Sequence, residues 1–200
     1  MIHIFEKGKS DDTIIALHGT GGHERDLIPF VKMMNPDANI LSIRGNIQEH
    51  GMNRYFKRIK PGVFDLESLR HETENLYDFI KSSVEKYQLK SDKIQVFGYS
   101  NGANIAINLM FTFENIFSDA ILFHPMIPQK EINIKHLNKT KVFICAGKND
   151  PIISIKESND LIHIFQKLEA VLSVYWSESG HTISNKSFQE AINWYKNREV

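Results

Sequence analysis

The chain has 200 residues, of which 42% are hydrophobic and 24% are charged. This composition is typical of a globular protein of one domain, here residues 1–200, and it excludes collagen, coiled coils and disordered chains. Lys and Arg total 24, as do Asp and Glu, so the net charge is zero and no electrostatic field favours nucleic acid as a partner.

Six short runs rich in Ile, Val and Phe predict buried strands. They lie at residues 13–17, 39–43, 93–97, 119–123, 141–146 and 170–176. Helical spacing between them predicts helices near 25–34, 66–87, 102–113, 155–169 and 185–197. This alternation predicts an α/β fold with a mostly parallel sheet covered by helices on both faces.

The segment 44–64 departs from this pattern. It holds glycines at 45, 51 and 62 and the apolar residues Met52, Tyr55 and Phe56, without a clean period. Loops of this length in compact domains are usually functional, and ligands of α/β sheets bind at the carboxyl ends of strands. We therefore expect it to close one side of a substrate site, the alternative being a surface loop that packs on itself.

A candidate nucleophile lies where the 93–97 strand meets the following helix. Gly98-Tyr99-Ser100-Asn101-Gly102 matches the G-x-S-x-G nucleophile elbow, in which small residues allow a tight turn that exposes the serine hydroxyl. The pattern alone is weak, because small residues occur in many turns. The strand before it and the apolar helix after it favour Ser100 as a nucleophile.

Two further residues supply the base and the acid that a serine needs. Asp150 follows the 141–146 strand, and His181 follows the 170–176 strand. The chain order Ser100, Asp150, His181 is that of α/β-hydrolases. Taken singly, Asp150 reads as an Asp-Pro turn residue and His181 as a solvated histidine, but their joint placement favours a triad.

An oxyanion hole is predicted after the first strand. The loop His18-Gly19-Thr20-Gly21-Gly22 is of the H-G-x-G type, so we assign the backbone amides of Thr20 and Asn101 as the two donors. A dinucleotide loop is disfavoured, because Glu24 stands where that motif needs a glycine.

No cofactor or metal is expected. His18, His23 and Glu24 have no second cluster with zinc-ligand spacing beside them. Cys145 is the only cysteine, so no internal disulfide forms, and it reads as a buried structural thiol. The N-terminal apolar run is short and meets Glu6, and no apolar run approaches the ~20 residues of a membrane helix, so we expect a cytoplasmic protein without a membrane span.

These motifs resemble the phospholipase/carboxylesterase family of α/β-hydrolases, and the likeness covers nearly the whole chain. Residues 17–22, 44–56 and 98–106 match the motifs of its small bacterial carboxylesterases, while His124 in 124–128 replaces the usual arginine of R-P-M-x-P. The resemblance implies a serine esterase that needs no cofactor and is often a homodimer.

The 17 residues 124–140, between two predicted strands, leave no room for a helical cap domain. We therefore expect an open site for a small-molecule ester, with Met52, Tyr55, Phe56 and Met126 as candidate pocket residues. Each of these four side chains equally fits a role in packing its own loop. The alternatives for the function are an acyl thioesterase or lysophospholipase with the same triad, and a noncatalytic ligand-binding protein of this fold.

Overall fold

The computed structural model describes residues 1–60, 62–130, 132–134 and 136–198. Seven strands form one sheet in the order β1-β3-β2-β8-β9-β10-β11. Their bounds are β1 (His3–Glu6), β2 (Thr13–Leu17), β3 (Asn39–Ile43), β8 (Ile94–Tyr99), β9 (Asp119–Phe123), β10 (Lys141–Gly147) and β11 (Val171–Ser177). Every neighbouring pair is parallel except β1 with β3. The predicted mostly parallel α/β sheet is confirmed, with β1 as an edge strand that the sequence patterns did not reveal.

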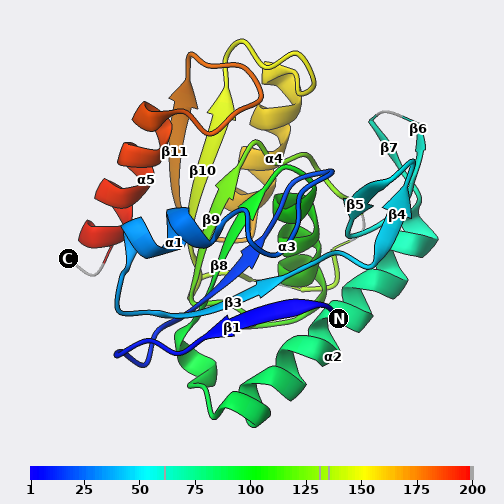
Figure 1. Ribbon diagram of the computed structural model, residues 1–200. Coiled ribbons are helices and arrows are strands. Elements are labelled where there is room, and N and C mark those ends of the chain that lie inside the picture. The colour runs from blue at the N-terminus through cyan, green and yellow to red at the C-terminus, as the bar shows by residue number, and fades with distance from the viewer. Residues whose placement is uncertain (61, 131, 135, 199–200) are drawn as a thin grey trace.

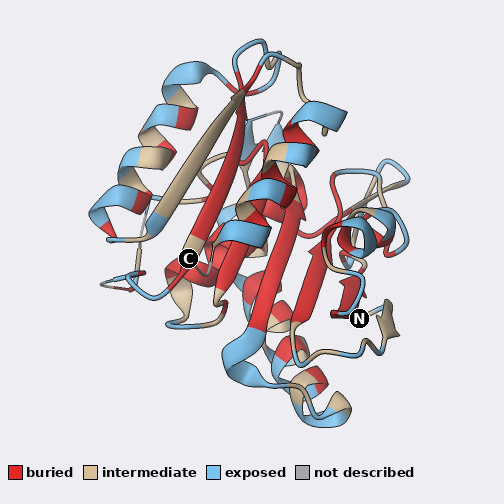
Figure 2. Ribbon diagram, turned by 90° about the vertical axis from the view of Figure 1, so that its left-hand side faces the viewer, coloured by how far each residue is buried: buried red, intermediate tan, exposed pale blue. Residues whose placement is uncertain are grey.

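Helices cover both faces of the sheet (Figure 1). α1 (Ile28–Met34) and α5 (Asn185–Asn197) pack on one face, while α2 (Leu66–Tyr87), α3 (Asn101–Thr112) and α4 (Ile155–Lys167) pack on the other. A short 3-10 turn, η1 (Ser91–Lys93), precedes β8. Strand side chains alternate between the two faces, so Ile14 packs with α1 and α5, whereas Ile15 packs with α2, α3 and α4. In Figure 2 the inner strands of the sheet are buried (red), the edge strand β11 is of intermediate burial (tan), and the helices expose their outer sides.

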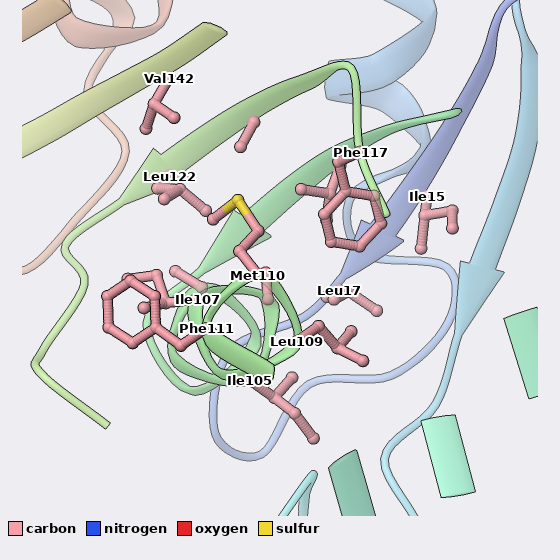
Figure 3. Close-up of a cluster of buried hydrophobic side chains, with 14 of the residues drawn as sticks. Ile15, Leu17, Ile105, Ile107, Leu109, Met110, Phe111, Phe117, Leu122 and Val142 are labelled. Atoms are coloured by element: carbon pink, nitrogen blue, oxygen red, sulfur yellow. The ribbon is translucent and has the colours of Figure 1, made fainter. Parts of the chain in front are cut away.

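α3 is the most deeply buried helix. Every residue from Asn101 to Phe111 is buried, because α3 lies between the sheet and its neighbouring helices. Figure 3 shows its side chains Ile107, Met110 and Phe111 packed towards Leu122 and Val142 of the strands. Burial on this scale stabilises the fold by roughly 1.5–3 kcal/mol for each large apolar side chain. The helix that follows Ser100 is therefore held rigidly.

The segment 44–64 forms two small hairpins rather than an irregular loop. They consist of β4 (Ile47–Glu49) with β5 (Met52–Arg54) and of β6 (Arg58–Lys60) with β7 (Val63–Phe64); residue 61 lies outside the described residues. Both hairpins stand beside the start of α2 (Figure 1, cyan). The first is fastened to the loop after β2, since the Gly21 amide donates to the Asn53 carbonyl at 2.9 Å and Asn53 Nδ2 donates to the Gly22 carbonyl at 2.7 Å.

The sequence predicted neither a helical cap nor a membrane span. Within the described parts of 124–140 there is no helix, as expected for a chain without a helical cap over the sheet. None of the helices in the described residues combines the length and apolar character that a bilayer crossing requires.

Candidate active site

The predicted site residues gather where the strand order reverses. The chain runs from β2 outwards to β3 on one side, and from the adjacent β8 outwards to β9, β10 and β11 on the other. Crevices outside the carboxyl ends of strands at such a switch point are where α/β sheets bind ligands. The oxyanion loop follows β2 and the elbow follows β8, so both lie beside this crevice.

The elbow holds Ser100 in a strained conformation. Its φ of 51° and ψ of −112° are rarely adopted by a residue with a side chain. The turn is tight enough to exclude other side chains, because a Cβ on Gly102 would meet the carbonyl group of Leu17, and one on Gly98 would lie 2.7 Å from Cα of Ala103. Strain and close approach together account for the glycines of the motif.

Ser100, His181 and Asp150 form a hydrogen-bonded chain. Nε2 of His181 lies 2.8 Å from Oγ of Ser100, and its Nδ1 lies 2.7 Å from Oδ2 of Asp150. The three residues come from three different loops after β8, β10 and β11. This is the geometry in which an imidazole removes a serine proton while a carboxylate fixes its tautomer.

Asp150 is an almost fully saturated acceptor. Its Oδ1 accepts from the amides of Ile152 and Ile153 at 2.8 and 3.1 Å, while its Oδ2 faces both His181 and His124. Burial opposes ionisation of this carboxyl, but the bonds from the Ile152 amide and from His181 outweigh burial and hold its pKa below the usual range. Asp150 is therefore ionised and fixed in orientation at neutral pH.

His124 is a second imidazole on the same carboxylate, and the sequence did not mark it as a site residue. Its side chain is fully buried, with Nδ1 2.9 Å from Oδ2 of Asp150 and Nε2 2.9 Å from the carbonyl of Thr182. Both partners are acceptors, so the ring makes both bonds only when both nitrogens carry protons. Burial, and then the charge of His181, lower the pKa of His124, which opposes that cation.

Of the two expected oxyanion donors, Asn101 belongs to the elbow, and Thr20 lines the same cavity as Ser100. Among the hydrogen bonds of the described residues, none is donated by the amide of Thr20 or of Asn101, so these N–H groups remain available to a ligand. Their side chains are anchored, since Thr20 Oγ1 accepts from Arg54 at 2.6 Å and Asn101 Oδ1 accepts from the Tyr55 amide at 2.7 Å. The assignment of the oxyanion hole stays a prediction.

A cavity of about 420 Å³ opens beside Ser100 and His181. It is bordered by the oxyanion loop, the elbow, both hairpins and the loops after β9, β10 and β11. The lining residues are Thr20, Met52, Arg54, Arg58, Gly62, Phe64, Tyr99, Ser100, Asn101, Asn104, Met126, Ile152 and His181. The segment 44–64 thus borders this cavity on one side, and two of the four candidate pocket residues, Met52 and Met126, line it.

Tyr55 and Phe56 correct the expectation for the pocket, because neither lines this cavity. Both side chains are wholly buried in the core. The Tyr55 hydroxyl donates to the Ile43 carbonyl at 2.6 Å and accepts from the His18 amide at 3.1 Å, while Phe56 packs edge-on against Phe64. Tyr55 therefore ties the ends of β2 and β3 together instead of contacting substrate.

Arg54 and Arg58 line the cavity although sequence reasoning passed over them. Charged residues in a loop are usually solvated, and no spacing distinguished these two from the other basic residues of the segment.

Cys145 is buried as expected, and burial raises its pKa to about 12, which leaves the thiol inert.

Among the described residues, the side chains of His124, Asp150 and His181 come close enough together to suggest a cation site. Their N···O distances of 2.7 and 2.9 Å are those of hydrogen bonds. Two ligands of a tetrahedral zinc ion lie about 3.3 Å apart. These distances therefore fit hydrogen bonds from the two histidines to Asp150 better than the ligands of a metal ion. The expected independence from metal and cofactor stays a prediction.

Comparison with known proteins identifies the family to which the chain is similar. The family model described as Phospholipase/Carboxylesterase matches residues 4–197. The hydrolase MhqD of Bacillus subtilis is 42% identical over 196 residues, which are 98% of each chain. A crystal structure of the Bacillus cereus carboxylesterase superposes with a TM-score of 0.94 at 39% identity, over 97% of this chain and 92% of that one. A structure of YahD with malic acid gives 0.92 at 35% identity over 98% of both chains.

Proposed function

The chain belongs to the phospholipase/carboxylesterase family of hydrolases, and from this premise we propose that it is a serine carboxylesterase acting on small carboxylic esters. The observation that carries the proposal is the contact of His181 Nε2 with Ser100 Oγ at 2.8 Å, beside an open cavity. A serine hydroxyl is a weak nucleophile unless an oriented base takes its proton. Here the base, its carboxylate and a hydroxyl that lines the cavity occur together.

In the proposed reaction, His181 takes the proton of Ser100 as Oγ attacks the ester carbonyl. The amides of Thr20 and Asn101 donate to the oxyanion that forms, and Asp150 stabilises the imidazolium. His181 then gives its proton to the departing alkoxide, which leaves as the alcohol. Water, deprotonated by His181, attacks the acyl group on Ser100, and the acid is released as Oγ regains its proton.

An acyl thioesterase or lysophospholipase would use the same residues, so the alternatives differ in substrate and not in machinery. A noncatalytic ligand-binding role is disfavoured by the intact triad contacts. The expected cytoplasmic location and homodimer are separate predictions that do not bear on this chemistry.

The test is turnover of p-nitrophenyl butyrate by the wild-type protein and by Ser100→Ala, with circular dichroism on both. We expect the variant to keep its fold and to lose activity to near background, because a hydroxyl that borders the cavity contributes little to packing. Equal turnover by the folded variant would refute the proposal. A panel of butyryl thioesters and lysophospholipids then separates esterase from the alternatives.

A further inference from the structure

The substrate cavity carries positive charge. Arg54, the last residue of β5, and Arg58, the first residue of β6, both line it together with Ser100. Among its described lining residues there is no Asp or Glu. The charged groups that a substrate would meet beside the nucleophile are thus two guanidinium groups.

One carboxylate, that of Glu49, holds both arginines in place. Its Oε1 lies 2.6 Å from Nε of Arg58, and its Oε2 lies 3.2 Å from Nε of Arg54. Two cations and one anion leave a net charge of +1 at the edge of the cavity. Burial, and then the charge of Arg58, lower the pKa of Arg54, as expected where the second positive charge is not fully offset.

The two arginines differ in how many of their N–H donors are available to a ligand. The Arg54 side chain is only 4% exposed, and it donates through Nε to the Phe56 carbonyl and through Nη1 to Thr20 Oγ1. The Arg58 side chain is 27% exposed, and within the described part of the chain its only hydrogen bond is from Nε to Glu49. Both terminal amino groups of Arg58 are therefore available as a planar pair of donors, which suits a carboxylate.

We propose that the preferred substrate is a short ester that also carries a free carboxylate, bound by Arg58 with the charge of Arg54 behind it. This inference rests on the proposed esterase function and specifies its substrate class. A volume of about 420 Å³ lies towards the small end of ligand cavities, which favours an ester of few carbons. A carboxylate near Arg58 would offset the net charge of the Glu49 cluster, whereas a neutral ester would leave it unpaired.

The competing interpretation is that Arg58 only fastens the hairpins to Glu49. Monoethyl succinate and ethyl butyrate separate the two, because they differ by a carboxylate in place of a methyl group. The variant is Arg58→Gln, which removes the charge and keeps a long polar side chain, with Arg58→Lys as the variant that keeps the charge. Lys60→Gln is the matched control, since Lys60 is an exposed cation of the same strand that does not line the cavity.

We expect wild-type kcat/KM to be at least about tenfold higher for monoethyl succinate than for ethyl butyrate at low salt, since hydrogen bonds to a charged group are worth about 1.5–3 kcal/mol. Arg58→Gln should abolish this preference through KM, Arg58→Lys should retain part of it, and Lys60→Gln should leave it unchanged. Salt should weaken the preference in the wild type. A wild-type protein that prefers ethyl butyrate, or an Arg58→Gln variant that loses both activities by one factor, would overturn the inference.

Binding separates a failure of this inference from a failure of the esterase proposal. Monoethyl succinate is titrated calorimetrically into Ser100→Ala, in which no turnover is needed, and into the same variant with Arg58→Gln added. We expect binding to the first and at least about tenfold weaker binding to the second. Binding without wild-type turnover would refute the esterase and keep the anion site, whereas turnover of neutral esters with no binding of the monoester would refute the anion site alone.

Discussion

Replacing Asp150 by Asn should abolish catalysis while keeping the fold. In the native site Oδ1 accepts from two backbone amides and Oδ2 faces two imidazole Nδ1 atoms. The amides of Ile152 and Ile153 cannot become acceptors, so the Asn oxygen must stay towards them. The reverse orientation would turn the Asn amino group towards both amides and leave that of the buried Ile153 without an acceptor, at about 1–3 kcal/mol.

The Asn amino group then takes the position of Oδ2 and donates to Nδ1 of His181. That bond forces the proton of His181 onto Nε2, which faces Ser100 Oγ as a donor and can no longer accept the serine proton. The same amino group donates to Nδ1 of His124, whose Nε2–H still donates to the Thr182 carbonyl. Every hydrogen bond is satisfied, yet the base is in the wrong tautomer.

We therefore expect kcat to fall by about 10⁴, which corresponds to about 5 kcal/mol of barrier. The assay is turnover of p-nitrophenyl butyrate from pH 6 to 9, with thermal unfolding measured in parallel. Asp160→Asn is the control, because Asp160 is an exposed acid paired with Lys156 on α4, and it should be unchanged. Activity of Asp150→Asn within tenfold of the wild type would refute the assigned tautomer and point to another acid.

Three further outcomes follow from the same contacts. The free energy of unfolding should decrease as the pH falls below about 6.5, because burial lowers the pKa values of His18 and His124 in the folded protein. Above the pKa of the unfolded chain both states are neutral and the full stability is present. Below it the unfolded state binds protons more readily, so each group removes up to ~1.4 kcal/mol of stability per pH unit. Urea unfolding at pH 5.5 and 7.5 checks this, and equal midpoints would contradict it. Gly102→Ala should yield little folded protein, because the added methyl meets the Leu17 carbonyl; a normal yield with full activity would show that the elbow relaxes. Met52→Ala should change the ratio of kcat/KM between butyrate and benzoate esters, since a pocket contact is worth ~1–3 kcal/mol; a uniform loss with lowered Tm would assign Met52 to packing.

Much of the sheet could be predicted because parallel strands are buried on both faces and therefore read as continuous apolar runs. The bounds of β2, β3 and β9 match the predicted runs residue for residue. β1 escaped because an antiparallel edge strand is only partly buried, and its four residues include His3 and Glu6.

The two hairpins were not predicted from the sequence, for a different reason. Their strands have two or three residues each, too few to display a period. The turn between β4 and β5 places His50 and Gly51 at positive φ, where Asn-Gly would have been the recognisable signal.

Some residues of the candidate site could be predicted from the sequence and others could not. Ser100, Asp150 and His181 stood out because the elbow fixes one residue and the strand ends fix the other two. An apolar residue type does not tell which way a side chain points, so Tyr55 and Phe56 were assigned to the pocket and instead belong to the core. The contacts of His124 and Arg58 depend on loops brought together by the fold, and no local spacing encodes them.

The central claim, that Ser100 is an activated nucleophile, is tested most directly by covalent labelling. A fluorophosphonate reacts with a serine only where a base and an oxyanion hole act on it. Intact-mass and peptide analysis of the folded protein should show one adduct, located on Ser100, and none on Ser100→Ala. A folded wild-type protein that gains no adduct, or a Ser100→Ala variant labelled to the same extent, would contradict the account.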